Sequence, residues 1–149
     1  YRPHQRKEQY SAEEIILGGG SFMSTNSFFY RRSLYPVEVL PKFWRECPIG
    51  DLPTALFFAA KGKIGYIDEE MSVYRVGAVG SWTSNQNTLK KRNSHFNAIL
   101  KMYDEYDEFT DYKYHAAIKK KKQRNSLNHI KSNIILIIRI ILARFGITI

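Results

Sequence analysis

Charge is divided unevenly along this chain, and the division limits how the chain can fold. Between residues 113 and 149 there are nine Lys or Arg and no Asp or Glu, whereas the first 112 residues carry 14 basic and 14 acidic side chains. The sequence therefore predicts a neutral globular part, residues 1–111, followed by a basic, apolar, helical tail, residues 112–149. With 149 residues and 44% hydrophobic content, the chain can bury one core but not two.

The tail has the character of a membrane-surface helix. It is rich in Ile and Leu, but Arg139 and Arg144 interrupt it before an apolar run reaches the roughly 20 residues that cross a bilayer. Basic residues upstream of such a segment are typical of a helix that lies in the membrane interface, attracted by anionic headgroups. A helix that packs on a further domain or on a second copy explains the same pattern nearly as well. We favour an anionic membrane surface as the partner.

Cysteine and histidine usage indicates a reducing compartment and no metal site. The single Cys47 cannot form a disulfide within the chain, and no N-terminal apolar stretch resembles a secretory signal. The four histidines and Cys47 lack the spacing of zinc ligands. We therefore expect a cytoplasmic protein, peripheral on the inner face of the plasma membrane.

Proline and glycine bracket one predicted helix. Asp51 has the character of an N-cap, Pro53 lies in the first turn, where its missing N–H costs nothing, and Gly62 follows the expected end. We predict a helix over residues 52–61. Its core-facing side chains are expected to be Leu56, Phe57, Ala59 and Ala60.

Residue patterns predict the remaining elements. Residues 1–14 are expected to be extended or loop, and residues 27–31 to form a short aromatic strand. Residues 64–67 and 71–75 are expected to be a pair of strands joined by an acidic turn. From residue 88 to residue 109 the apolar residues recur every three or four positions, which predicts an amphipathic helix.

Three segments in this order carry a resemblance to a known family: residues 18–32, the motif Gly50-Asp51-Leu52-Pro53, and residues 63–75. Together they resemble the C-terminal, acceptor-binding half of the family-two inverting glycosyltransferases, over residues 15–82. The resemblance implies an α/β fold, the C-terminal part of a GT-A domain with short strands and flanking helices. It implies transfer of a sugar, with inversion, from a nucleotide-diphosphate sugar to a glycan or lipid-linked acceptor.

Asp51 is the candidate catalytic residue. Inverting transfer needs a general base that takes a proton from the acceptor hydroxyl, and a carboxylate is the usual base. In the resembling family an acidic pair stands at this point, and here Gly50 replaces the first acid. Taken without the resemblance, Asp51 would be interpreted as a helix cap, and one side chain can have both roles.

The resemblance also implies binding residues and a metal. A divalent cation, Mg or Mn, is expected in the full-length enzyme, with its ligands mostly outside this chain, because no Asp-x-Asp motif follows an apolar strand here. The nucleotide-binding half does not appear in the sequence, so we expect this portion alone to be inactive. A loop anchor explains Trp82 as well as sugar stacking does. The implied acceptor residues are Thr25, Ser27, Arg31 and Trp82, and those for the donor diphosphate and its loop are Arg75 and Ser81.

Two nonenzymatic classes remain as alternatives. A net charge of +9 and the run Lys119 to Lys122 fit a nucleic-acid binder. However, the aromatic residues lie mostly in the neutral part, whereas single-strand binders interleave aromatic and basic residues. We therefore expect no nucleic-acid partner. The other alternative is a membrane-docking adaptor whose globular part only binds a partner protein.

Overall fold

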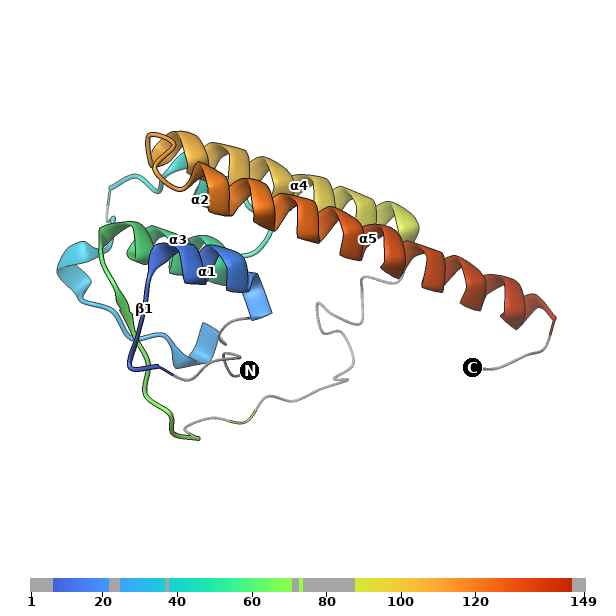
Figure 1. The fold of residues 1–149 in the computed structure, drawn as a ribbon, viewed down its shortest axis with the longest axis horizontal. Coiled ribbons are helices and arrows are strands. Elements are labelled where there is room, and N and C mark those ends of the chain that lie inside the picture. Colours follow the sequence, from blue (N-terminus) through green and yellow to red (C-terminus); the bar gives the residue numbers. More distant parts are fainter. Residues whose placement is uncertain (1–6, 22–24, 37, 71–72, 74–87, 146–149) are drawn as a thin grey trace.

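The computed structural model describes residues 7–21, 25–36, 38–70, 73 and 88–145. Of these residues 69% are in helices and 3% in strands, and they form five α-helices and one two-stranded sheet. Figure 1 shows the two longest helices, α4 and α5, side by side above α1 and α3. The α/β GT-A fold implied by the resemblance is therefore wrong for this chain.

The described residues form ten elements along the chain. Helical segments of three residues, labelled η, separate several of them. Their bounds are β1 (Gln9–Tyr10), α1 (Ala12–Gly18), η1 (Gly19–Ser21), η2 (Thr25–Ser27), η3 (Arg32–Leu34), α2 (Lys42–Arg45), α3 (Asp51–Lys61), β2 (Ile64–Gly65), α4 (Leu89–Phe109) and α5 (His115–Arg144).

The sheet is too small to form a layer of the fold. β1 and β2 are antiparallel, with Gln9 opposite Gly65 and Tyr10 opposite Ile64. Two strands of two residues each cannot support a domain, which needs three or more strands or a packed helix. The predicted strand over residues 27–31 is wrong, because η2 ends at Ser27 and residues 28–31 are irregular. The strand predicted over residues 71–75 lies outside the described residues except for Val73, which is in no strand.

Helices with local sequence signals lie where we expected them. α3 begins at Asp51, one residue before the predicted start, and ends at Lys61 before Gly62. Three of its four predicted core residues are buried, and Ala60 is half-buried. α4 is the amphipathic helix predicted over residues 88–109, and the Thr88 side chain accepts a hydrogen bond from the backbone N–H of Lys91.

The expectation of loop or extended chain over residues 1–14 is wrong in part, because α1 begins at Ala12. Ser11 and Glu14 form a capping box at its start. The Glu14 backbone N–H donates to Ser11 Oγ at 3.3 Å, and the Ser11 backbone N–H donates to Glu14 Oε2 at 3.0 Å. This reciprocal pair satisfies two backbone donors that the first turn leaves without intrahelical partners.

Aromatic side chains dominate the core between α3 and α4. Tyr106 is fully buried, and its hydroxyl donates a hydrogen bond of 3.0 Å to the carbonyl oxygen of Leu56 in α3. Its ring contacts Phe43 of α2 edge-on, with the centroids 5.2 Å apart. A buried hydroxyl is costly unless it is hydrogen-bonded, so this bond fixes the relative position of the two helices. The buried hydrophobic residues are Tyr10, Ala12, Ile15, Ile16, Phe43, Trp44, Leu52, Leu56, Phe57, Ala59, Ile99, Met102, Tyr103, Tyr106, Tyr114 and Ile118.

The beginning of α5 belongs to this core, and the rest of the helix leaves it. Asp111 and Tyr112 have positive φ angles of 50° and 58° and reverse the chain between α4 and α5. Ile118 and Lys121 are buried, whereas large apolar residues are exposed from Leu127 onward. Figure 1 shows the C-terminal part of α5 extending past the other helices.

Lys121 joins α5 to the end of α1. Its Nζ donates to the carbonyl oxygens of Leu17 at 3.1 Å and Gly18 at 3.2 Å, and Arg124 also donates to the Leu17 carbonyl. These carbonyls end α1, where cations are favourable. Only 7% of Lys121 is exposed. Burial, and secondarily the charge of Arg124, lowers the pKa of Lys121 to about 8.

Gly19 lies where α5 contacts the end of α1, and its backbone conformation can be tested by substitution. Its φ of 68° and ψ of −161° are open essentially to glycine alone. We expect Gly19→Ala to lower the free energy of unfolding by about 1–3 kcal/mol, measured by urea denaturation. Gly20→Ala is the matched control, because a Cβ there meets no atom within 4 Å. An equal loss in both variants would contradict this account.

The lowered pKa of Lys121 predicts that the stability of the fold depends on pH. An unfolded lysine has a pKa of about 10.4, so between pH 8 and 10.4 the unfolded chain binds more protons than the folded one. The contribution of Lys121 to stability therefore rises with pH through this window and is constant below it. Relative to Lys121→Met, we expect the free energy of unfolding to gain on the order of 2 kcal/mol between pH 7 and pH 10.

Urea denaturation at pH 7 and pH 10 measures this difference, because other titrating groups act equally in both proteins. Lys120→Met, at an exposed neighbouring position, is the control and should follow the unsubstituted chain. A parallel change in the chain and in Lys121→Met would show that Lys121 does not titrate in this window.

Candidate functional site

A cavity of about 250 Å³ lies where η2 and η3 meet the C-terminal end of α3 and β2. Segments that are about 30 residues apart in the sequence form its two sides. The lining side chains that matter for binding are Ser27, Tyr30 and Arg31 on one side and Phe58, Lys61 and Lys63 on the other.

Stacked aromatic rings form one wall of this cavity. Tyr30 stacks on Phe58 of α3, with the centroids 4.7 Å apart and the planes at 22°. Tyr30 also stacks on Tyr35, at 5.6 Å and 18°. Tyr30 is 48% exposed and the adjoining Phe29 is 84% exposed. Large rings held in place but half open to solvent offer apolar contact area at little cost in conformational entropy.

The charges around the cavity have one sign. Arg31, Lys61 and Lys63 line it, and no Asp or Glu is among its described lining residues. The Lys61 ammonium also lies 4.7 Å from the centre of the Phe57 ring. The cavity is therefore positively charged with an aromatic wall, a combination that suits a ligand with an apolar ring face and an anionic group.

Asp51 lies at the opposite end of α3. Gly50 is the N-cap and Asp51 the first helical residue, so the expected N-cap role of Asp51 is wrong by one position. Its Oδ1 accepts a hydrogen bond of 2.8 Å from the Leu52 backbone N–H, and the residue is partly exposed. A carboxylate in the first turn is stabilised by the positive end of the helix dipole.

α3 separates Asp51 from the cavity. At 1.5 Å per residue, the helix places Asp51 about 15 Å from Lys61. His95 of α4 is close enough to Asp51 to sense its charge: burial lowers the pKa of His95, and the Asp51 carboxylate opposes that shift. From the sequence, His95 is expected to be a surface or helix residue, and no local pattern predicts that it lies near Asp51.

Of the residues assigned through the resemblance, the structure brings together Ser27 and Arg31. Thr25 is the first residue of η2 and is exposed, but it does not line the cavity. Arg75, Ser81 and Trp82 lie outside the described residues. Four further lining residues were not predicted as binding residues from the sequence: Tyr30, Phe58, Lys61 and Lys63. Two aromatic residues followed by two basic residues, in Phe29-Tyr30-Arg31-Arg32, were a usable signal for a binding site, but the same segment also fits the predicted strand.

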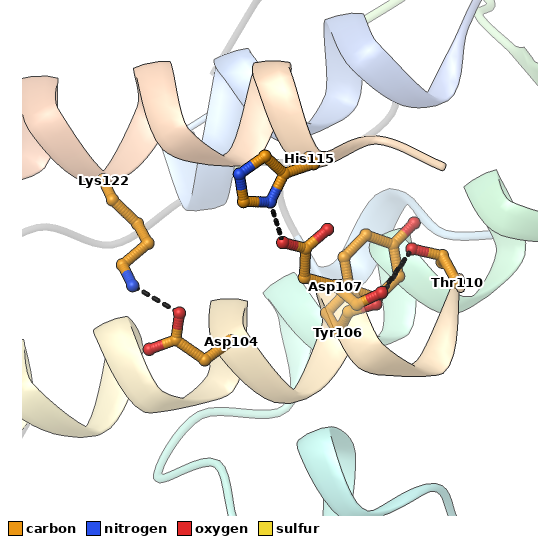
Figure 2. A network of polar contacts seen from close by, with 6 residues as sticks. All are labelled: Asp104, Tyr106, Asp107, Thr110, His115 and Lys122. Atoms are coloured by element: carbon orange, nitrogen blue, oxygen red, sulfur yellow. Dashed lines mark hydrogen bonds and ion pairs between the residues drawn. The ribbon is translucent and has the colours of Figure 1, made fainter. Parts of the chain in front are cut away.

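A second polar cluster connects α4 and α5 (Figure 2). Asp107 Oδ2 and His115 Nδ1 are 2.6 Å apart, and Lys122 pairs with Asp104. The Thr110 hydroxyl donates to the Tyr106 carbonyl oxygen at 3.0 Å. This cluster lines an open groove of about 650 Å³. Since its charged groups pair with one another across the helices, we interpret it as a structural clamp.

A divalent cation does not fit the described part of the chain. Within it, no three His, Cys, Asp or Glu side chains form a group that could hold a metal ion. Asp51, the candidate base, has no second carboxylate at Gly50 with which to share a cation.

Comparison of this chain with known protein families, curated proteins and solved structures found no match. The resemblance to family-two glycosyltransferases thus stays a prediction from the sequence motifs.

Proposed function

We propose that this chain is the acceptor-binding portion of an inverting glycosyltransferase, which uses a nucleotide-diphosphate sugar and a glycan or lipid-linked acceptor. One observation carries the proposal: Ser27 and Arg31, the residues that the resemblance links to the acceptor, line one cavity with the Tyr30–Phe58 stack. Sugar rings have apolar faces that pack on aromatic rings, and their hydroxyls need a few well-placed polar groups. The cavity offers both.

Asp51 is proposed as the general base. A base must reach the acceptor hydroxyl, and Asp51 is partly exposed at the start of α3. Among the described residues, its carboxylate accepts its hydrogen bond from the Leu52 backbone N–H through Oδ1 alone. Oδ2 is then the oxygen that would take the proton. Because about 15 Å separate Asp51 from Lys61, the acceptor would extend along α3 by more than one sugar unit. The metal ligands would lie mostly outside this chain. Arg75 and Ser81, which lie outside the described residues, would contact the donor diphosphate.

The substitution Asp51→Asn tests this role. Asparagine keeps the shape and can still accept the Leu52 hydrogen bond, but it cannot take a proton at neutral pH. In the complete transferase we expect the transfer rate to fall by about 10²–10⁴-fold, with the thermal midpoint nearly unchanged. The measurement is product formation from the nucleotide sugar, and Glu38→Gln at an exposed position is the control. A wild-type rate in Asp51→Asn would remove Asp51 from the mechanism.

A different observation favours attachment to a membrane through α5. This helix is long and apolar enough to cross a membrane, by length and composition, and no residue of its most apolar stretch is buried. Spacings of three and four residues place one set of exposed isoleucines on a single face. That set is Ile130, Ile134, Ile137, Ile138 and Ile141.

The contacts of α5 leave this face open. His129 stacks on Phe96 of α4, with the centroids 4.0 Å apart, and the Arg92 guanidinium donates to the Ser132 carbonyl oxygen at 3.3 Å. These contacts use the other side of the helix. Lys131, Arg139 and Arg144 supply positive charge with no acid nearby in the sequence. We propose that α5 lies in the interface of an anionic membrane on the cytoplasmic side, with its arginines extended toward the headgroups.

Vesicle sedimentation tests the membrane proposal. We expect the chain to sediment with anionic vesicles, less strongly at high salt, and weakly with neutral vesicles. Removing the whole tail after Asp111 would also remove the buried Ile118 and Lys121, so substitution is the better test. Each inserted isoleucine contributes about 1.5–3 kcal/mol, so Ile134→Ser/Ile138→Ser/Ile141→Ser should lower binding at least about tenfold.

The matched control is Val39→Ser/Ile67→Ser, which changes two exposed apolar residues away from α5. It should sediment like the unsubstituted chain. If the unsubstituted chain stays in solution with anionic vesicles and forms a dimer that the triple substitution disrupts, α5 binds a second copy and the membrane proposal is wrong.

A further inference from the structure

We propose that the cavity between η2, η3 and the end of α3 recognises a phosphorylated sugar, so that the acceptor carries a phosphate beside its ring. This inference rests on the proposed function and adds the chemical class of the substrate. The groups that would bind it are Arg31, Lys61 and Lys63 for the phosphate, Tyr30 and Phe58 for the ring, and Ser27 for a hydroxyl.

The first support is the unbalanced charge of the cavity. Arg31, Lys61 and Lys63 line the same 250 Å³ space, and within the described residues none of them forms an ion pair. Elsewhere in this structure lysines do find carboxylates: Lys42 pairs with Glu105, and Lys101 with Glu46. Three like charges around one small space repel one another, and a bound anion would relieve that repulsion.

The helix dipole alone does not explain these cations. Lys61 ends α3, where a positive charge is favourable in any protein. Arg31, however, comes from the separate segment before η3, and Lys63 lies beyond the helix end. Two segments distant in the sequence bring positive charge to one cavity, which points to a ligand with a compact negative charge. Phosphate fits this description, since arginine and lysine both bind it well.

The second support is the aromatic wall. Phosphate alone does not need a ring, yet Tyr30 is held by stacking on Phe58 at 4.7 Å and on Tyr35 at 5.6 Å while 48% of it stays exposed. The exposed part of this ring can pack against a flat apolar face of a ligand. The phosphate therefore belongs to a ligand with a ring.

Cavity size favours a single sugar ring over a run of stacked bases. Single-stranded nucleic acid also combines phosphates with stacking bases, but its binding sites track about 4 or more nucleotides along a groove. The cavity measures about 250 Å³, below the roughly 300–1,000 Å³ of sites for drug-sized ligands, and so holds one ring. A single phosphorylated monosaccharide unit matches both the size and the charge.

Isothermal titration of the chain tests the inference with four probes: glucose 1-phosphate, glucose 6-phosphate, glucose and inorganic phosphate. We expect at least one sugar phosphate to bind tenfold or more tightly than glucose or phosphate. A preference for the 1-phosphate would indicate the linkage found when a sugar is carried on a lipid phosphate. A preference for the 6-phosphate would indicate a phosphate on the glycan itself.

The paired variant Lys61→Gln/Lys63→Gln should weaken sugar-phosphate binding at least tenfold and leave glucose binding unchanged. Lys90→Gln/Lys119→Gln removes the same charge from exposed positions outside the cavity and should have no such effect. Far-UV circular dichroism shows whether each variant is folded. Tyr30→Leu tests the aromatic wall separately and should weaken both sugar phosphate and glucose.

The inference would be overturned if glucose bound with the same affinity as both sugar phosphates. It would also be overturned if inorganic phosphate bound as tightly as the sugar phosphates. Tighter binding of a single-stranded oligonucleotide, lost in Lys61→Gln/Lys63→Gln, would also overturn it. If these results came with loss of transfer in Asp51→Asn, the proposed function would stand without the phosphate. If no sugar bound and Asp51→Asn kept full activity, the proposed function itself would fail.

Discussion

The rest of the structure depends on the hydrogen bond from the Tyr106 hydroxyl to the Leu56 carbonyl oxygen, which holds α4 against α3. It joins α4 to α3 inside a core of aromatic rings, and burial raises the pKa of the Tyr106 phenol, so this hydroxyl stays a donor. α3 carries Asp51 at one end and Lys61 at the other. A helix fixed at its middle by α4 keeps both ends in place, and thereby the separation between the candidate base and the cavity. We expect disruption of this contact to affect both sites together.

The basic tail has two physically different halves. In the first half, positive charges contact other parts of the protein: Lys121 and Arg124 bind the end of α1, and Lys122 pairs with Asp104. These contacts explain why α5 starts within the core although its sequence is strongly basic. In the second half, Lys131, Arg139 and Arg144 accompany exposed isoleucines. The net charge of +9 therefore overstates what the tail can offer to an anionic surface.

The cavity and Asp51 fit one extended ligand better than two separate ones. Both belong to α3: cations line the cavity near one end, and a partly exposed carboxylate lies at the other. An acceptor that runs along α3 would contact each of them, with its phosphate and ring in the cavity and its reactive hydroxyl near Asp51. This arrangement would also place binding energy far from the reacting atoms, where it can position them.

The sequence by itself determined the helices whose signals are local. Pro53, Gly62 and the spacing of apolar residues over residues 88–109 predicted α3 and α4 to within about a residue, because caps and periodicity act within a few turns. Only the tertiary structure decided what depends on distant contacts. β2 pairs with Gln9 and Tyr10, which lie far earlier in the chain, and Arg31 meets Lys61 in one cavity. Lys121 binds an α1 carbonyl more than 100 residues away. No local pattern encodes such pairings, since they depend on how helices pack, and that packing also replaced the expected α/β fold with a helical one.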